Sequence, residues 1–239
     1  MGDGVLEKLR LAVIYFVDSN RKPIGTGFFV SPRVAISAAH SFTESVMVGT
    51  IRTGYFGKPH VGKTCQLKVD LIDRENDFII FAIQGKDAPQ HLEPAPVRLD
   101  PGGECILVAY QLGIHDELKE LGKEPSVGVF PGAITKAHER HFVYNAPSFA
   151  GDSGGAIILR EGQVIGMHIM TVNQALELQR LKSLDEDKAT TSDIVQHVDS
   201  VEKSIDSLIK SLSSGALGLS ISSIMAAHRS NQQSKRKLL

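Results

Sequence analysis

One short segment of the sequence carries residue types that could do nucleophilic chemistry: Gly151-Asp152-Ser153-Gly154-Gly155. A serine hydroxyl is a weak nucleophile unless a base takes its proton and hydrogen-bond donors stabilise the oxyanion that follows. The glycines allow a sharp turn that leaves Ser153 uncrowded. The same turn can bring the N–H groups of Gly151 and Ser153 to one point. The rest of the chain must therefore supply a base and a group that orients the base.

Short apolar segments rich in β-branched and aromatic residues surround this motif. We expect strands at residues 11–17, 24–30, 34–38, 45–51, 64–72, 77–83, 105–110, 127–134, 141–145, 156–159 and 164–172. Turn residues separate these segments at short intervals, and no helical period competes with them. The sequence therefore predicts an all-β fold, a barrel or a sandwich.

Prolines divide the predicted strands into two groups. Pro89, Pro94, Pro96 and Pro101 lie between the strands expected at 77–83 and 105–110. Proline removes a backbone donor and fixes φ, so this stretch is a connector and not a core strand. We expect a first β-barrel over residues 1–90, a connector over 91–103 and a second β-barrel over 104–175.

After about residue 173 the apolar spacing changes from that of a strand to that of a helix. From Ile194 to Leu212, apolar residues recur at intervals of three and four, which predicts a helix over 192–212 within a helical extension at 176–214. This helix could pack on the second barrel, or it could mediate self-association or bind a partner. We expect residues 215–239 to form a flexible tail.

Composition excludes several classes of function. The net charge of −1 gives no reason to expect nucleic acid as the partner. Neither the histidines nor the two cysteines, Cys65 and Cys105, have the spacing of a metal site, so we expect no metal and no cofactor. With so few cysteines, no convincing signal peptide and no apolar run long enough to span a membrane, we expect an intracellular protein with reduced thiols.

Three motifs, taken in chain order, resemble those of chymotrypsin-like serine peptidases. Residues 25–30 followed by 34–40, which end in Ala38-Ala39-His40, resemble the segment that carries the family's histidine. Residues 76–80, Asn-Asp-Phe-Ile-Ile, resemble the segment that carries its aspartate, and residues 151–155 resemble its nucleophile loop. The resemblance covers about residues 9 to 173 and implies two antiparallel six-stranded barrels.

The resemblance implies a role for each residue. Ser153 would attack the scissile carbonyl of a protein or peptide substrate, and His40 would take and later return the proton. Asp77 would hold the imidazole, although Asp70 and Asp73 lie near it and an acid in this position can also be a turn residue. The N–H groups of Gly151 and Ser153 would form the oxyanion hole.

Activation differs from that of secreted trypsins. Those enzymes are cut to expose an amine that pairs with the aspartate before the serine, which here is Asp152. No such cleavage site stands near the start of this chain. The sequence is therefore closer to intracellular or viral-type members, and it predicts a cytoplasmic protein, with the nucleus also open, or one derived from a viral polyprotein.

Specificity differs from that of trypsin as well. Six residues before the serine, where trypsin has an acid, stands Pro147. Residues 164–169 resemble the G-x-H segment of picornavirus-type main proteases and of glutamyl endopeptidases, whose histidine binds a Gln or Glu side chain. We therefore expect His168, Pro147 and Met170 to contact the substrate, with a histidine satisfied in the core or on the barrel surface as the alternative for His168.

The sequence thus predicts a serine endopeptidase that forms an acyl-enzyme and prefers Gln or Glu before the cut. A different class stays open, because the activating amine is missing. In that alternative the fold is a catalytically silent binding module, which recruits a partner through its cleft or its C-terminal helix.

Overall fold

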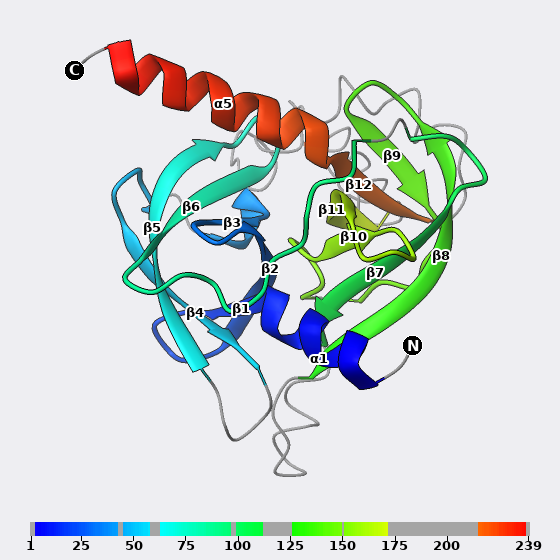
Figure 1. Ribbon diagram of the computed structural model, residues 1–239, viewed down its shortest axis with the longest axis horizontal. Helices are drawn as coiled ribbons and strands as arrows, with labels where there is room; N and C mark the ends of the chain where they lie inside the picture. Colours follow the sequence, from blue (N-terminus) through cyan, green and yellow to red (C-terminus); the bar gives the residue numbers. More distant parts are fainter. Residues whose placement is uncertain are drawn as a thin grey trace, which may run out of the picture.

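The computed structural model describes residues 3–42, 45–57, 63–96, 99–111, 126–149, 151–171 and 215–237. Over these ranges the chain forms two closed antiparallel β-barrels of six strands each, with a helix at the C-terminal end (Figure 1). The all-β fold of two barrels expected from the sequence is confirmed.

The first barrel has the strand order β1-β2-β3-β6-β5-β4 and closes where β1 pairs with β4. Its strands are β1 (Val13–Val17), β2 (Pro23–Ser31), β3 (Val34–Ser37), β4 (Ile51–Phe56), β5 (Lys63–Asp73) and β6 (Phe78–Gln84). The strand expected at 45–51 was misplaced. A Cβ on Gly54 would lie 2.9 Å from Leu67 Cδ1, so the glycine that weakened the strand signal lets β4 approach β5 closely.

The second barrel has the order β10-β11-β12-β9-β8-β7. Its strands are β7 (Glu104–Tyr110), β8 (Val127–Ala137), β9 (His141–Tyr144), β10 (Ala156–Ile158), β11 (Val164–Thr171) and β12 (Ala216–Ser220). The expectation of a flexible tail from residue 215 was wrong at this point. All five residues of β12 are buried, and the strand pairs with both β11 and β9, so the second barrel does not end at residue 175.

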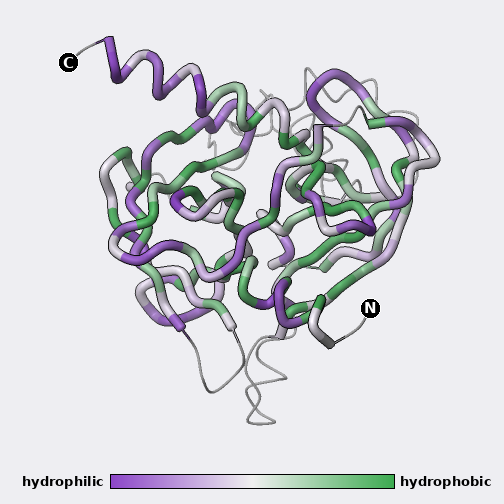
Figure 2. Tube along the Cα trace, in the orientation of Figure 1, coloured by the Kyte–Doolittle hydropathy of each residue, from purple (hydrophilic) through white to green (hydrophobic). Residues whose placement is uncertain are grey.

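Helix α5 (Ile221–Lys237) also replaces the expected tail. It leaves the end of β12 and crosses to the first barrel (Figure 1). There the Asp70 carboxylate on β5 accepts hydrogen bonds from Asn231, Gln232 and Lys235, the last with Nζ 2.6 Å from Oδ1. Figure 2 shows that the C-terminal end of α5 is hydrophilic. Polar contacts with a distant strand hold this end, and a search for apolar spacing cannot find them.

The other helical segments are short. Helix α1 (Asp3–Ala12) precedes β1 and buries Leu9, and the 3-10 turn η1 (Ala39–Ser41) follows β3. The helix expected at 192–212 lies outside the described residues. Among the helices that the structure describes, none has the length and apolar character needed to cross a membrane.

A continuous apolar cluster joins the two barrels. It includes Phe28 and Phe78 from the first barrel, Val108 and Met167 from the second, and Ile224 from α5. Each barrel also has its own internal core. Because apolar burial is the main stabilising term in folding, the shared cluster holds the facing surfaces of the two barrels at a defined separation. The residues singled out from the sequence lie along this contact.

Candidate active site

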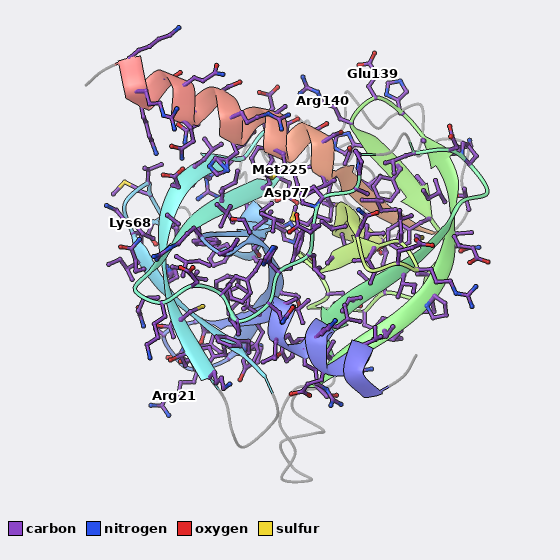
Figure 3. All side chains as sticks on the ribbon, in the orientation of Figure 1. Arg21, Lys68, Asp77, Glu139, Arg140 and Met225 are labelled. Atoms are coloured by element: carbon purple, nitrogen blue, oxygen red, sulfur yellow. The ribbon has the colours of Figure 1, made fainter. Side chains whose placement is uncertain are left out.

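His40 and Asp77 form a close pair on the first barrel. The Asp77 side chain is fully buried, and His40 Nδ1 lies 2.6 Å from Asp77 Oδ2. The His40 backbone N–H also donates to Asp77 Oδ1, at 2.9 Å. Figure 3 labels Asp77 beneath α5, where the barrels face one another. Both carboxylate oxygens thus bind the same histidine, one its ring and one its backbone.

Local structure explains how the chain presents this pair. His40 lies in η1, directly after β3, and Asp77 is the last residue before β6, the strand next to β3. Asp77 has φ of 57°, in the left-handed region that aspartate tolerates better than most residues. Neighbouring strand ends therefore bring the two side chains together, although 37 positions separate them in sequence.

Pairing with Asp77 determines the pKa and the tautomer of His40. Burial of the ring lowers the pKa of His40, but the charge of Asp77 and its hydrogen bond raise it more, so the pKa is higher than the usual 6.5. A carboxylate at Nδ1 selects the tautomer with the proton on Nδ1. The lone pair of the neutral ring is then on Nε2.

The two other aspartates considered for this role are engaged elsewhere. Asp70 binds α5. Asp73 accepts hydrogen bonds at 2.9 Å from both the backbone N–H and the side-chain amide of Asn76. Asp73 is the last residue of β5, and its carboxylate binds the turn that follows. Of the three aspartates, Asp77 is the one with a hydrogen bond to the His40 ring.

The nucleophile loop lies between β9 and β10 and turns at two glycines with positive φ, Gly151 at 92° and Gly154 at 84°. The Gly154 N–H donates to His168 O at 2.9 Å, and the Gly155 N–H donates to Asp152 O at 2.8 Å. A Cβ on Gly154 would lie 2.0 Å from Thr26 O, so this position requires glycine for both space and conformation.

The loop meets the first barrel beside His40. The Thr26 N–H donates to Ser153 O at 2.9 Å, and the Thr26 hydroxyl donates to Gly151 O at 3.0 Å. A Cβ on Gly25 would lie 2.5 Å from Ser41 Oγ and 3.4 Å from Ser153 O, so the residue after His40 and the nucleophile loop pack over the same glycine. The structure thus brings all three predicted segments to one contact.

Two features of this loop bear on reactivity. The Ser153 hydroxyl donates to Ile169 O at 3.1 Å. Within the described residues, the backbone N–H groups of Gly151 and Ser153 make no hydrogen bond. Unpaired backbone donors at a glycine-rich turn can stabilise an anion, which is the arrangement expected of an oxyanion hole.

Asp152 is buried and only half paired. Its Oδ2 accepts a hydrogen bond from the Phe149 N–H at 2.7 Å, whereas Oδ1 has no partner in the described part of the chain. Burial raises the pKa of Asp152 to about 7, and the Phe149 hydrogen bond opposes this shift. No described residue supplies a cation to pair with the Asp152 carboxylate.

His168 lies on β11 and is buried. Its Nδ1 is 2.7 Å from the Tyr144 hydroxyl on β9. Burial lowers the pKa of His168 to about 3, the charge of His40 adds to the lowering, and Asp77 opposes it. Its imidazole is therefore neutral. The Tyr144 hydroxyl can donate to Nδ1 or accept from it, and donation, which pairs the hydroxyl proton, leaves an N–H on Nε2.

The two other expected substrate contacts are less enclosed. Met170 follows on the same strand and is half-buried, and Pro147 is exposed in the loop between β9 and the nucleophile loop. Thr26 and Tyr144 contact the site although the sequence analysis did not single them out. Thr26 stands between the glycines of the 25–27 motif, which is a local signal, whereas all four residues of β9 are buried, so no alternation distinguishes Tyr144.

Other kinds of site find no support in the described residues. No group of three or more His, Cys, Asp or Glu side chains there is placed to hold a metal ion. Cys65 and Cys105 are free, as expected, and burial raises the pKa of each thiol to about 11. Neither thiol is therefore activated as a nucleophile.

Comparisons with known proteins agree with the fold. The active form of the Rv3671c protease from M. tuberculosis is 22% identical over 71% of this chain and 76% of that chain, with a TM-score of 0.52. A Glu endopeptidase is 16% identical over 67% and 79%, with a TM-score of 0.55. The HtrA-type protease AlgW, solved with a decapeptide, is 13% identical over 94% and 65%, with a TM-score of 0.58. At these identities the likeness establishes the fold. No curated protein sequence matches the chain.

Family membership rests on a separate match. The trypsin-like peptidase domain matches residues 25–167, more than half of the chain, and this span includes His40, Asp77 and Ser153. That membership and the fold together support the function of a serine-type peptidase. The chain belongs to the trypsin-like peptidase domain family of chymotrypsin-like serine proteases.

Proposed function

We propose that the protein is a serine endopeptidase in which His40, Asp77 and Ser153 act as a catalytic triad. The observation that carries this proposal is the pairing of both Asp77 oxygens with His40, next to the loop that bears Ser153. A buried carboxylate that orients a histidine ring is the arrangement that general-base catalysis by histidine requires. A turn aspartate without a catalytic role has no need of the ring contact.

The chemistry follows from this arrangement. Ser153 Oγ forms a bond to the scissile carbonyl carbon while its proton passes to His40 Nε2. The N–H groups of Gly151 and Ser153 stabilise the oxyanion. The C–N bond then breaks, and His40 returns the proton to the leaving amine. Water attacks the acyl-enzyme by the same route and releases the acid and the free enzyme. Asp77 stabilises the imidazolium formed in each step.

One rotation of the serine side chain precedes catalysis. In the structure the Ser153 hydroxyl donates to Ile169 O. We expect a change of χ1 to another staggered rotamer, over a barrier that side chains cross readily, to direct this hydroxyl to His40 Nε2. Because catalytic hydrogen bonds often tighten only when substrate is bound, this rotamer is compatible with an active enzyme.

Substrate preference depends on His168. Its neutral ring, with a donor N–H on Nε2, suits the side-chain oxygen of Gln before the cut. A Glu carboxylate would also accept this hydrogen bond, but it would bury a charge beside an uncharged ring at a cost. We therefore expect Gln to be preferred over Glu, with Pro147 and Met170 contacting the same side chain. The proposed resemblance to picornavirus-type main proteases is limited to this histidine and its hydrogen bond to the substrate side chain.

A fluorophosphonate probe tests the triad. We expect wild-type protein to be labelled on Ser153, the Ser153→Ala variant to remain unlabelled, and the wild type to cleave a peptide library. If folded wild-type protein neither reacts with the probe nor cleaves any peptide across the pH range, the proposal is wrong. The binding-module alternative, which the half-paired Asp152 favours, would then replace it.

A cleavage profile tests the pocket. Tyr144→Phe removes the hydroxyl that sets the His168 tautomer and keeps the aromatic packing, so the preference for Gln should fall while cleavage of other peptides persists. Tyr110→Phe, a buried tyrosine on β7, is the matched control and should leave the profile unchanged. An identical profile for wild type and Tyr144→Phe would show that His168 does not select the substrate.

The cellular compartment is a further expectation. Two free cysteines support an intracellular, reducing location, because secreted relatives of this size commonly carry disulfides. Fractionation of the source cells, with thiol titration of the purified protein, checks this.

A further inference from the structure

We propose that Thr26, on the first barrel, is a positioning residue that holds the oxyanion-hole loop of the second barrel in its active shape. This inference rests on the proposed function of Ser153 as the nucleophile. It goes further by naming a side chain outside the triad, on the opposite barrel, on which the geometry of the hole depends.

Every polar group of Thr26 is used. The side chain is fully buried, its N–H donates to Ser153 O, and its hydroxyl donates to Gly151 O at 3.0 Å. The same hydroxyl accepts a hydrogen bond from the Tyr110 N–H on β7 at 3.2 Å. The Thr26 carbonyl accepts one from the Ser37 hydroxyl at 2.6 Å. Thr26 is thus bonded to its own barrel, to β7 and to the nucleophile loop.

The two loop contacts of Thr26 fall on the two residues whose N–H groups would form the oxyanion hole. Thr26 binds the carbonyl of Gly151 and the carbonyl of Ser153. A bound carbonyl fixes the peptide plane that follows each residue, and so restrains the backbone angles that aim its N–H. Catalysis by such donors depends on their being aimed in advance.

Gly151 needs this restraint more than another residue would. It has φ of 92° and no Cβ, so its backbone can move to other conformations at low cost. On the other side of the loop, Gly154 packs against the Thr26 backbone, and its N–H donates to His168 O. The loop is therefore held from β2 on one side and from β11 on the other, and the side chain that contacts Gly151 is that of Thr26.

The hydroxyl of Thr26 is the part that can be tested by itself. Valine has the same shape but neither donates to Gly151 O nor accepts from Tyr110 N–H, so Thr26→Val leaves two buried groups unpaired. Serine keeps the hydroxyl. Ser37→Ala is the matched control, because it also removes a buried hydroxyl that bonds to Thr26, but one that only packs against Gly154 and makes no hydrogen bond to the loop in the described residues.

The experiment compares kinetics of the folded variants below their melting temperatures. We expect Thr26→Val to lower kcat and the rate of fluorophosphonate labelling by about 10- to 100-fold with little change in KM, because misplaced donors lose transition-state stabilisation. Its affinity for a peptide boronic acid, which mimics the tetrahedral intermediate, should fall by a similar factor. Thr26→Ser and Ser37→Ala should stay within a few-fold of wild type.

The outcomes separate this inference from the proposed function. If wild type is labelled and Thr26→Val is labelled at the same rate, Thr26 has only a structural role and this inference is wrong. If wild type is never labelled, the proposed function fails first. Should Thr26→Val not fold, Thr26→Cys replaces it, with a weak thiol donor in a similar volume.

Discussion

Asp77 on the first barrel and Asp152 on the second are both fully buried, and both lie within the proposed active site. Asp77 has both oxygens bonded to His40, whereas Asp152 has one oxygen bonded to a backbone N–H and the other without a partner in the described residues. The histidine of the first barrel is thus fully oriented by its carboxylate. On the second barrel, burial raises the pKa of the Asp152 carboxyl, and contacts with the first barrel partly hold the nucleophile loop.

This contrast suggests different roles for the carboxyl groups of Asp77 and Asp152. In the proposed mechanism Asp77 acts through its charge, because it would stabilise the imidazolium of His40. Asp152 acts through its shape and its single hydrogen bond to Phe149, which closes the turn that carries Ser153. Replacing the charge at each position by an amide of equal size therefore separates the two roles.

The largest expected effect is that of Asp77→Asn. Asparagine tolerates the positive φ at this position, so the fold should persist while the His40 tautomer is lost. We expect kcat to fall about 10,000-fold, as the triad template predicts. Kinetics on a Gln-containing peptide check this, with circular dichroism to confirm folding. In Asp73→Asn, which changes a carboxylate at the end of β5 that binds Asn76, kcat should change less than about 10-fold. Equal losses in both variants would contradict the assignment.

Asp152→Asn should act on stability, and with a pH dependence. A carboxyl whose pKa is raised from 3.8 unfolded to about 7 folded favours folding below pH 3.8, and this contribution is lost as the pH rises through about 7. The wild type should therefore lose on the order of a few kcal/mol between these limits. The amide does not titrate, so Asp152→Asn should be the more stable protein at pH 8 and lose the advantage at low pH.

Urea denaturation of both proteins at several pH values measures this difference. A constant difference across the pH range would mean that Asp152 does not carry a proton in the fold. Labelling of Asp152→Asn by the fluorophosphonate probe adds a second reading, since the loop should stay reactive without the charge.

The smallest expected effect concerns Asp70, an aspartate away from the site. Its carboxylate accepts three hydrogen bonds from α5, but the Lys235 side chain is 43% exposed, so solvent weakens that ion pair. Asp70→Ala should lower the free energy of unfolding by about 1 kcal/mol and leave kcat per folded molecule unchanged. Lys235→Met is the control for the charge alone and should cost less. A large loss of kcat in Asp70→Ala would show that α5 supports the site directly.

Much of this arrangement could be predicted from the sequence, because its signals are local. Ser153, His40 and Asp77 each stand in a short motif next to a strand, the short strands with turns between them predict a barrel or a sandwich, and the family resemblance implies two barrels. Asp77 could be separated from Asp73 only by position before an apolar run, and the structure adds the ring contact that distinguishes them.

The rest depends on contacts between distant segments. In the sequence, β12 is a short stretch that contains serine and glycine and gives no strand signal. Its five residues form a buried strand because β9 and β11 pair with it on either side. The C-terminal part of α5 has no apolar face from which a helix could be predicted. Its contact with the first barrel is polar and is made with Asp70. In the sequence Thr26 is simply the residue between two glycines, and only the structure shows its contact with the nucleophile loop.

The position of β12 also constrains the order of events during synthesis. The other five strands of the second barrel precede β12 in the chain, yet β12 is the strand that joins β9 to β11. Until the ribosome has made Ser220, β11 has an unpaired edge and the loop bearing Ser153 stands on an open sheet. A peptidase with this topology can complete the barrel that carries its nucleophile only after β12 has been made, which would protect the nascent chain and its neighbours before that point.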